Sequence, residues 1–227
     1  RVGGSHRSNF KTIQQDFARR DFSINTLYYQ PRHGVILDFC HAMADIQKRQ
    51  LRLIGEPRKR FEEDPVRILR VLRFAAKLEF QIDPAILAQL TPAMTRLLRE
   101  VSPHRLYDES QKMLGGGHLT ALLPLLIEYH VWPQLFADVP AEVTPFIQRA
   151  AHNTDQRIAQ DKTVNPAFFY AVLLWETFLA REKQLRSRVS GWSEAMITAS
   201  IDVLKRQQPY TAIPRFAEQF IREVWEL

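Results

Sequence analysis

Apolar and polar positions alternate most regularly between Arg58 and Phe80, where apolar residues recur at helical spacing. Arginines stand three residues apart in this stretch, at Arg67, Arg70 and Arg73. Asp64 is a favourable N-cap, and the proline after it suits the first turn of a helix. The pattern therefore predicts a helix that begins at Asp64.

The arginine stripe on this helix has two explanations. The first turns of a helix carry partial positive charge, so arginines are unfavourable there, and a stripe placed against that preference indicates an anionic partner. Alternatively, Glu62, Glu63 and Asp64 neutralise the arginines within one ion-pair network. The stripe alone leaves both explanations open.

The residues before this helix contain the only pattern that predicts β-strands. The run from Ile24 to Tyr29 is rich in β-branched and aromatic residues, and Val35 to Leu37 follows after a turn at Pro31 to Gly34. Short helices are predicted over Thr12–Asp21 and Ala42–Gln50. An apolar run from Leu51 to Ile54 leads to Gly55 and Pro57.

After Pro57 the pattern predicts helices. A capping residue followed by proline, which favours a helix start, recurs at Asp64, Asp83, Thr91, Ser102, Thr144 and Asn165. Glycines 115–117 end the helix that begins at Ser102. Apolar periodicity continues over Leu119–Tyr129, Phe168–Leu179, Met196–Leu204 and Ile213–Trp225, and the tryptophans at 132, 175, 192 and 225 are predicted to be core residues. The predicted fold class is mostly α, a helical array preceded by a small β-containing part.

Composition narrows the class of protein. With 45% hydrophobic residues among 227, the chain is globular, and no apolar run approaches the ~20 residues of a membrane span. The formal charge of +6 favours an anionic partner such as nucleic acid. Cys40 is the single cysteine, which excludes an internal disulfide and fits a cytoplasmic location.

Two motifs carry a family resemblance. The run EEDPVRILRVLRFAAKLEF resembles the helix motif E-D-x-x-R-x-x-R-x-x-R-F of class II nucleotidyltransferases, the superfamily of bacterial poly(A) polymerases and CCA-adding enzymes. Upstream, Arg19 to Asn25 resembles the R-R-D-F-T-I-N motif of the same superfamily, with serine in place of threonine. The two motifs stand in the order expected for the superfamily.

The resemblance implies roles for individual residues. Asp21 matches the third catalytic carboxylate of the superfamily and is a candidate magnesium ligand. Nucleotide contacts are implied for Arg19, Arg20, Asn25, Asp64, Arg67 and Arg70. These residue types suit the chemistry, because nucleotidyl transfer needs carboxylates for divalent metal ions, and the planar arginine fork binds phosphate oxygens bidentately. The expected cofactor is Mg²⁺, with ATP as substrate.

The sequence departs from the superfamily in two places. The metal-binding Asp-x-Asp after a Gly-Gly turn has no match, because Gly3 and Gly4 are followed by Ser5, His6 and Arg7. We therefore expect a partial copy of the enzyme that is inactive by itself. The Asp-Pro-x-Gly-Gly turn of many CCA-adding enzymes is also missing at residues 38–42, which counts against that activity.

Further segments resemble the poly(A) polymerases. Leu53–Pro57, Asn153–Arg157 and Asn165–Phe169 look like this group, and Ser102–Lys112 resembles the neck segment R-x-x-x-E-x-x-K. Within that neck segment, we expect Arg105 and Glu109 to form an i,i+4 pair that supports the helix. The predicted domains are the C-terminal edge of a nucleotidyltransferase head (1–57), a helical neck with the nucleotide-binding helix (58–115) and a helical RNA-binding body (116–227).

The predicted function is template-independent polyadenylation, in which AMP passes from ATP to an RNA 3′ end. The expected partners are the RNA 3′ end and ATP, without a membrane. Two alternatives stay open: a CCA-adding tRNA nucleotidyltransferase, and a non-catalytic helical RNA-binding module.

Overall fold

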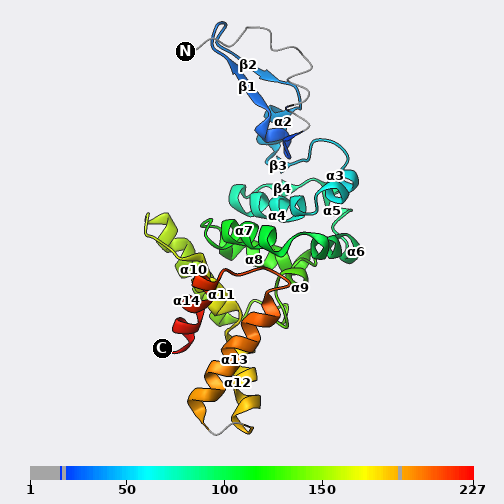
Figure 1. Cartoon of the computed structure of the whole chain (residues 1–227). Coiled ribbons are helices and arrows are strands. Elements are labelled where there is room, and N and C mark those ends of the chain that lie inside the picture. The colour runs from blue at the N-terminus through cyan, green and yellow to red at the C-terminus, as the bar shows by residue number, and fades with distance from the viewer. Residues whose placement is uncertain (1–15, 17–18, 189–190) are drawn as a thin grey trace, which may run out of the picture.

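The computed structural model describes residues 16, 19–188 and 191–227, and most of this part of the chain is helical. Figure 1 shows a β-hairpin at one end, a layer of helices in the middle and a long helical pair at the other end. The predicted fold class, mostly α with a small β-containing part in front, is confirmed. The domain boundaries at residues 57 and 115 stay a prediction.

The hairpin consists of β1 (Leu27–Gln30) and β2 (Val35–Asp38), which pair antiparallel with Leu27 opposite Asp38. The turn between them is the predicted one. The first strand starts later than the predicted Ile24, because a 3₁₀ turn, η1 (Ser23–Asn25), precedes it. Thr26 donates its hydroxyl to the carbonyl of Ser23, a local bond that competes with strand pairing.

A second pairing corrects the expectation that all β-structure precedes Pro57. The chain first forms α2 (Ala42–Lys48) and then β3 (Gln50–Leu51), which pairs in parallel with β4 (Gln81–Ile82). The amide of Gln81 donates to the carbonyl of Arg49 at 2.8 Å. A two-residue strand has no detectable periodicity, so its pairing depends on tertiary context.

The stretch Arg58–Phe80 forms two helices, and the predicted one starts at Val66, shortly after the predicted capping residue Asp64. Helix α3 (Pro57–Glu63) was not predicted, and α4 (Val66–Leu78) begins after an extended Asp64, with φ −149° and ψ 95°. A residue before proline is disfavoured in the helical region, so the chain breaks at this point. The Asp64 carboxylate still accepts a bond from the amide of Val66, at 3.3 Å.

Helix α4 is central to the core. Seven of its residues are buried, and its apolar face packs against α7 (Pro103–Leu114) and α8 (Leu119–Glu128). The remaining elements of this middle layer are α5 (Pro84–Leu87), α6 (Pro92–Thr95), the 3₁₀ helix η2 (Arg96–Glu100) and α9 (Trp132–Leu135). Burial of the α4 face therefore fixes the direction in which its polar face points.

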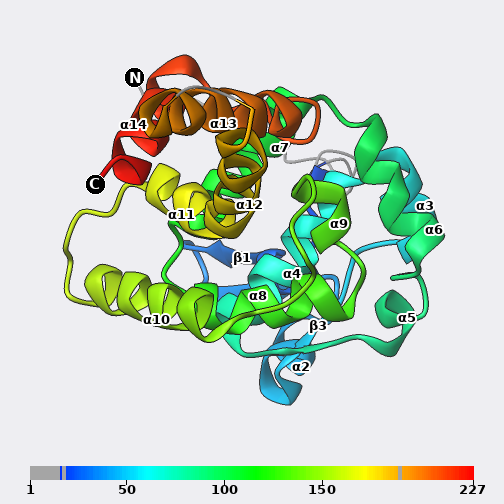
Figure 2. The same cartoon turned by 90° about the horizontal axis from the view of Figure 1, so that it is seen from below.

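The C-terminal helices are α10 (Pro145–Ala159), α11 (Pro166–Leu173), α12 (Trp175–Arg186), α13 (Trp192–Gln207) and α14 (Arg215–Trp225). Helix α11 packs against α14, and α12 pairs with α13 as the arm at the lower end of Figure 1. Figure 2 shows α10 and α11 on the same side of the molecule. No helix in the described ranges is long and apolar enough to cross a membrane.

The proline-based helix starts are confirmed for the five helices other than α4. The side chains of Asp83, Thr91, Thr144 and Asn165 accept capping bonds, and Gly115 caps the end of α7 as predicted.

Two further predictions need correction, and one lies largely outside the described residues. The predicted helix Phe168–Leu179 is two helices that break at Leu174. Trp192 is not a core residue, since it starts α13 at the tip of the arm and is 64% exposed. Of the predicted helix Thr12–Asp21, Asp16 and Arg19 are helical, and most of the rest lies outside the described residues.

We expect the β1–β2 hairpin to be the least protected regular structure. A two-stranded ribbon is marginal by itself, and Tyr29 and Ile36 are exposed on it. In native-state hydrogen exchange, the paired amides of β1 and β2 should exchange much faster than those of α4 and α8. Protection of the hairpin equal to that of α4 would contradict this expectation.

Candidate functional site

Asp21 is fixed from both sides by its backbone surroundings. Its carbonyl accepts a hydrogen bond from the amide of Ile54 at 2.9 Å. The Arg60 guanidinium donates to the carbonyl of Arg20 at 2.8 Å. These bonds attach the Arg19–Asn25 motif to α3 and to the segment before it. As a result the Asp21 side chain is 5% exposed and faces the polar side of α4.

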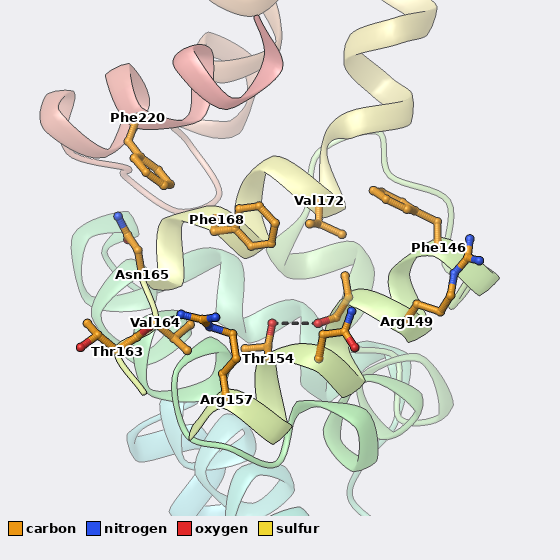
Figure 3. Close-up of a pocket in the computed structure, with 12 residues that line it drawn as sticks. Phe146, Arg149, Thr154, Arg157, Thr163, Val164, Asn165, Phe168, Val172 and Phe220 are labelled. Atoms are coloured by element: carbon orange, nitrogen blue, oxygen red, sulfur yellow. Dashed lines mark hydrogen bonds between the residues drawn. The ribbon is translucent and has the colours of Figure 1, made fainter. Parts of the chain in front are cut away.

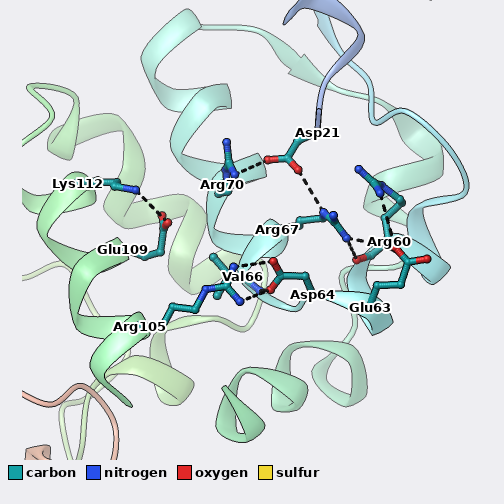
Figure 4. Close-up of polar contacts among 10 residues, drawn as sticks. All are labelled: Asp21, Arg60, Glu63, Asp64, Val66, Arg67, Arg70, Arg105, Glu109 and Lys112. Carbon is teal, nitrogen blue, oxygen red and sulfur yellow. Dashed lines mark hydrogen bonds and ion pairs between the residues drawn. The ribbon is translucent and has the colours of Figure 1, made fainter. Parts of the chain in front are cut away.

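The Asp21 carboxylate joins the two motif segments, as Figure 4 shows. Its Oδ1 accepts a hydrogen bond from Nε of Arg67 at 3.2 Å, across 46 residues of sequence. Its Oδ2 lies 2.8 Å from Nη1 of Arg70, an ion pair without an aligned hydrogen bond. One buried carboxylate therefore holds two guanidiniums of the arginine stripe.

Arg67 has further partners on α3. Its Nη1 donates to the carbonyl of Arg60 at 3.0 Å and to Oε2 of Glu63 at 3.4 Å. Glu63 also lies 3.6 Å from Arg60. The expected neutralising network is therefore present for Glu63 and Arg67, although the carboxylate closest to Arg67 is Asp21.

Asp64 forms a bidentate pair with Arg105 on α7. The two nitrogen–oxygen distances are 2.9 Å and 2.6 Å. This hydrogen-bonded pair raises the pKa of Arg105, and desolvation of the guanidinium opposes the rise. The expected pairing of Arg105 with Glu109 is wrong, because two parallel bonds to Asp64 outweigh a single contact along the helix. Glu109 instead pairs with Lys112, at 3.3 Å.

Arg73 continues the stripe along α4 and is half-buried. Burial lowers the pKa of its guanidinium, a nearby Glu109 raises it, and Arg70 lowers it further. The guanidinium lies over the Phe74 ring, 4.8 Å from the centroid. Its Nε is buried without a hydrogen-bond partner among the described residues. Arg73 is thus held mainly by packing, in contrast to Arg67.

The predicted site residues fall into two groups. Asp21, Asp64, Arg67 and Arg70 come together at the junction of α3, α4 and α7. Arg20 belongs to a separate contact, since it pairs with Asp16 at 3.0 Å, lies over the Tyr28 ring and donates to the backbone of Asn25. Arg19 is exposed.

Sequence reasoning missed two members of the cluster. Arg60 carries no motif signal, and its contacts depend on the unpredicted helix α3. Arg105 lies in the segment that resembles the neck motif, but the sequence predicted Glu109 as its partner. Its pairing with Asp64 spans 41 residues, which periodicity cannot reveal.

The described residues do not fit a magnesium site. No group of three or more histidine, cysteine, aspartate or glutamate side chains is placed to hold a metal ion in the part of the chain that the structure describes. Both carboxylate oxygens of Asp21 face guanidiniums. The carboxylates of the cluster therefore hold arginines. For a ligand, the cluster offers the guanidiniums of Arg67 and Arg70 and the partly free carboxylate of Asp64.

Two family models match the chain. One, described as the poly A polymerase head domain, matches residues 2–52. The other, described as the probable RNA- and SrmB-binding site of polymerase A, matches residues 79–142. The contacts of Asp21 with Arg67 and Arg70 thus connect the first matched segment to the helix that lies between the two.

Curated relatives match most of the chain. Poly(A) polymerase I of Escherichia coli O6:H1 is 37% identical over 96% of this chain and 49% of that protein. A tRNA nucleotidyltransferase of Schizosaccharomyces pombe is 30% identical over 76% of this chain and 40% of that protein. The chain spans about half the length of the curated poly(A) polymerases that it matches.

The fold also matches solved structures. The structure titled tRNA-processing enzyme, apo form I, superimposes with a TM-score of 0.64 over 92% of this chain and 52% of that one. At 19% sequence identity this likeness shows the fold alone. The arrangement of a β-containing segment and a helical array is therefore shared with that enzyme.

We expect Asp21→Asn to destabilise the protein by roughly 3 kcal/mol, because it leaves two guanidiniums without their buried counter-charge. Urea denaturation measures the loss. The matched control is Asp202→Asn, which removes a partly exposed partner of Arg181 and should cost at most ~1 kcal/mol. Equal losses in the two variants would show that the buried Asp21 pairs stabilise the protein no more than a partly exposed pair does.

Proposed function

Because the chain belongs to the poly(A) polymerase family of class II nucleotidyltransferases, we propose that it serves template-independent polyadenylation, the transfer of AMP from ATP to an RNA 3′ end. The observation that carries this proposal is the contact of Asp21 with Arg67 and Arg70, which joins the two motif segments of the superfamily at one place. The proposed partners are ATP and the RNA 3′ end, in the cytoplasm.

Two features favour AMP transfer over CCA addition. The Escherichia coli poly(A) polymerase matches 96% of this chain at 37% identity, whereas the yeast tRNA nucleotidyltransferase matches 76% at 30%. Residues 38–42 also lack the proline and glycines of the CCA-type turn. CCA addition is therefore the second candidate, and it is supported by the likeness of fold to a tRNA-processing enzyme.

Asp64 and Arg67 suit the recognition of a nucleobase edge. A carboxylate has about four lone-pair sites. Arg105 uses one on each oxygen, and the Val66 amide uses a second on Oδ1, so one site stays open on Oδ2. This site can accept a hydrogen bond from an exocyclic amino group, while the Arg67 guanidinium donates to a ring nitrogen.

This acceptor–donor pair favours bases that carry an amino group. Adenine and cytosine each present an amino donor, whereas uracil presents a carbonyl at the corresponding position. The pair therefore discriminates ATP and CTP from UTP, but hydrogen bonding alone does not discriminate ATP from CTP. We propose that the choice of ATP depends on the shape of the surroundings of the base.

The remaining arginines suit the phosphates. Arg70 is partly exposed beyond its pair with Asp21, and its planar fork can bind phosphate oxygens. We propose that Asp21 positions Arg67 and Arg70, and that a direct catalytic role of its carboxylate, as in the superfamily, needs a different set of partners. Nucleotidyl transfer generally uses Mg²⁺ to neutralise phosphate charge, and we propose the same requirement here.

Arg67→Lys tests nucleotide recognition. Lysine keeps the positive charge near Asp21 but loses the fork, so affinity for ATP and CTP should fall about tenfold while UTP affinity stays unchanged. Isothermal titration calorimetry with the three nucleotides and a thermal melt measure this. Arg58→Lys, on the exposed side of α3, is the control and should bind all three as the wild type does. A lower Tm with equal losses for all nucleotides would assign Arg67 to the fold alone.

We expect the 227-residue chain by itself to bind ATP without extending RNA. The described residues offer one carboxylate of the proposed catalytic set, and that is too few for a two-metal site. Incubation of the chain with a labelled oligo(A) primer, ATP and Mg²⁺ should give no longer product. Extension would refute this expectation, whereas the absence of ATP binding would favour the non-catalytic RNA-binding module.

A further inference from the structure

A large groove lies among the C-terminal helices, apart from the ion-pair cluster. It has a volume of about 730 Å³ and lies among α10, α11 and α14 (Figure 3). These three helices contribute no residue to the cluster around Asp21. Helix α10 packs on α8, and α8 packs on α4, so a layer of one helix separates the two places.

Aromatic rings line this groove from three helices. Phe146 comes from α10, Phe168 from α11 and Phe220 from α14. Figure 3 shows the three rings around the opening, with Val172 between Phe146 and Phe168. Phe146 and Phe168 are 42% and 41% exposed, although both stand on well-packed helices. Exposed rings on rigid elements are typical of a surface that takes a flat ligand.

The groove is also basic. Arg149 and Arg157 line it from α10, two helical turns apart, and no carboxylate is among the lining residues. Neither arginine has an ion-pair partner among the described residues, and the Arg157 guanidinium makes only a long contact of 3.4 Å with the carbonyl of Thr163. The nearby carboxylate, Asp155, is occupied because it accepts the amides that begin α8, at 2.8 Å and 2.9 Å.

We propose that this groove binds a single-stranded segment of RNA, with bases stacked on the phenylalanine rings and phosphates on Arg149 and Arg157. The combination of a basic groove with accessible aromatic rings is the general way in which proteins hold single strands without reading their sequence. An acidic peptide would match the arginines but leave the rings without stacking partners, so the observations favour RNA.

This inference rests on the proposed function and adds a second RNA contact to it. An RNA segment bound in this groove is held at a distance from the reacting 3′ end, because the ion-pair cluster lies on the other side of α8. Such a contact should set the affinity for longer RNA and leave nucleotide binding at α4 unchanged. The two properties can therefore be measured separately.

Fluorescence anisotropy with a 5′-labelled 20-nucleotide oligo(A) and the full chain tests the proposal. Phe146→Leu with Phe168→Leu keeps apolar bulk but removes two rings, and affinity should fall about fivefold or more. Arg149→Gln with Arg157→Gln removes two phosphate contacts, which should flatten the slope of log affinity against log salt by about 1.4.

Matched controls separate the groove from general effects. Phe216→Leu removes a ring that is exposed on α14 outside the groove, and Lys183→Gln with Arg188→Gln removes the same charge elsewhere. Both should bind oligo(A) within about twofold of the wild type. Circular dichroism melts check that each variant is folded.

A crosslinking experiment locates the RNA directly. An oligo(A) with one 5-iodouridine, irradiated on the wild-type chain, should crosslink to peptides that contain Phe146, Phe168 or Phe220. Unchanged affinity in both groove variants, or crosslinks only elsewhere, would overturn the groove as an RNA site even if ATP binding supports the proposed function. If the chain binds oligo(A) at the groove but does not bind ATP, the RNA groove is supported and the proposed function fails.

Discussion

The arrangement of α3, α4 and α7 depends on a buried carboxylate that faces two guanidiniums. Asp21 is 5% exposed, and removing such a charge from water costs several kcal/mol unless partners replace its hydration. Arg67 and Arg70 provide this compensation from α4. Because the apolar face of α4 is buried against α7 and α8, these arginines are held in place by the core. The arginines that neutralise Asp21 are thus positioned by the packing of residues that lie far from Asp21 in the sequence.

The same core orders the other polar contacts around the cluster. Arg105 reaches Asp64 because α7 packs along α4, and Arg60 reaches the backbone before Asp21 because α3 ends beside the start of α4. Helix α8 supports α4 on one side and α10 on the other. The proposed nucleotide site and the proposed RNA groove are therefore mounted on one continuous helical scaffold.

Local signals allowed much of the fold to be predicted from sequence. Proline after a capping residue marked the starts of α5, α6, α7, α10 and α11, since both residues act on their own backbone. At α4 the same rule identified the capping residue, since Asp64 is extended and accepts the amide of Val66, although the helix itself starts at Val66. The strand β4 and the partner of Arg105 depend on contacts between distant segments, so neither could be inferred from spacing. For the site, the motifs identified Asp21 and Arg67, and only the structure showed that they pair with each other.

The parallel pairing of β3 with β4 has a consequence for the order of folding. It joins Gln50 to Gln81 and closes a loop that contains both α3 and α4. Loop closure costs chain entropy before the strand contacts compensate it, so local helices form first and the strand pair follows. The contact of Asp21 with α4 needs both the closed loop and the docked motif segment. We therefore expect this ion pair to be among the last native contacts to form around α3 and α4.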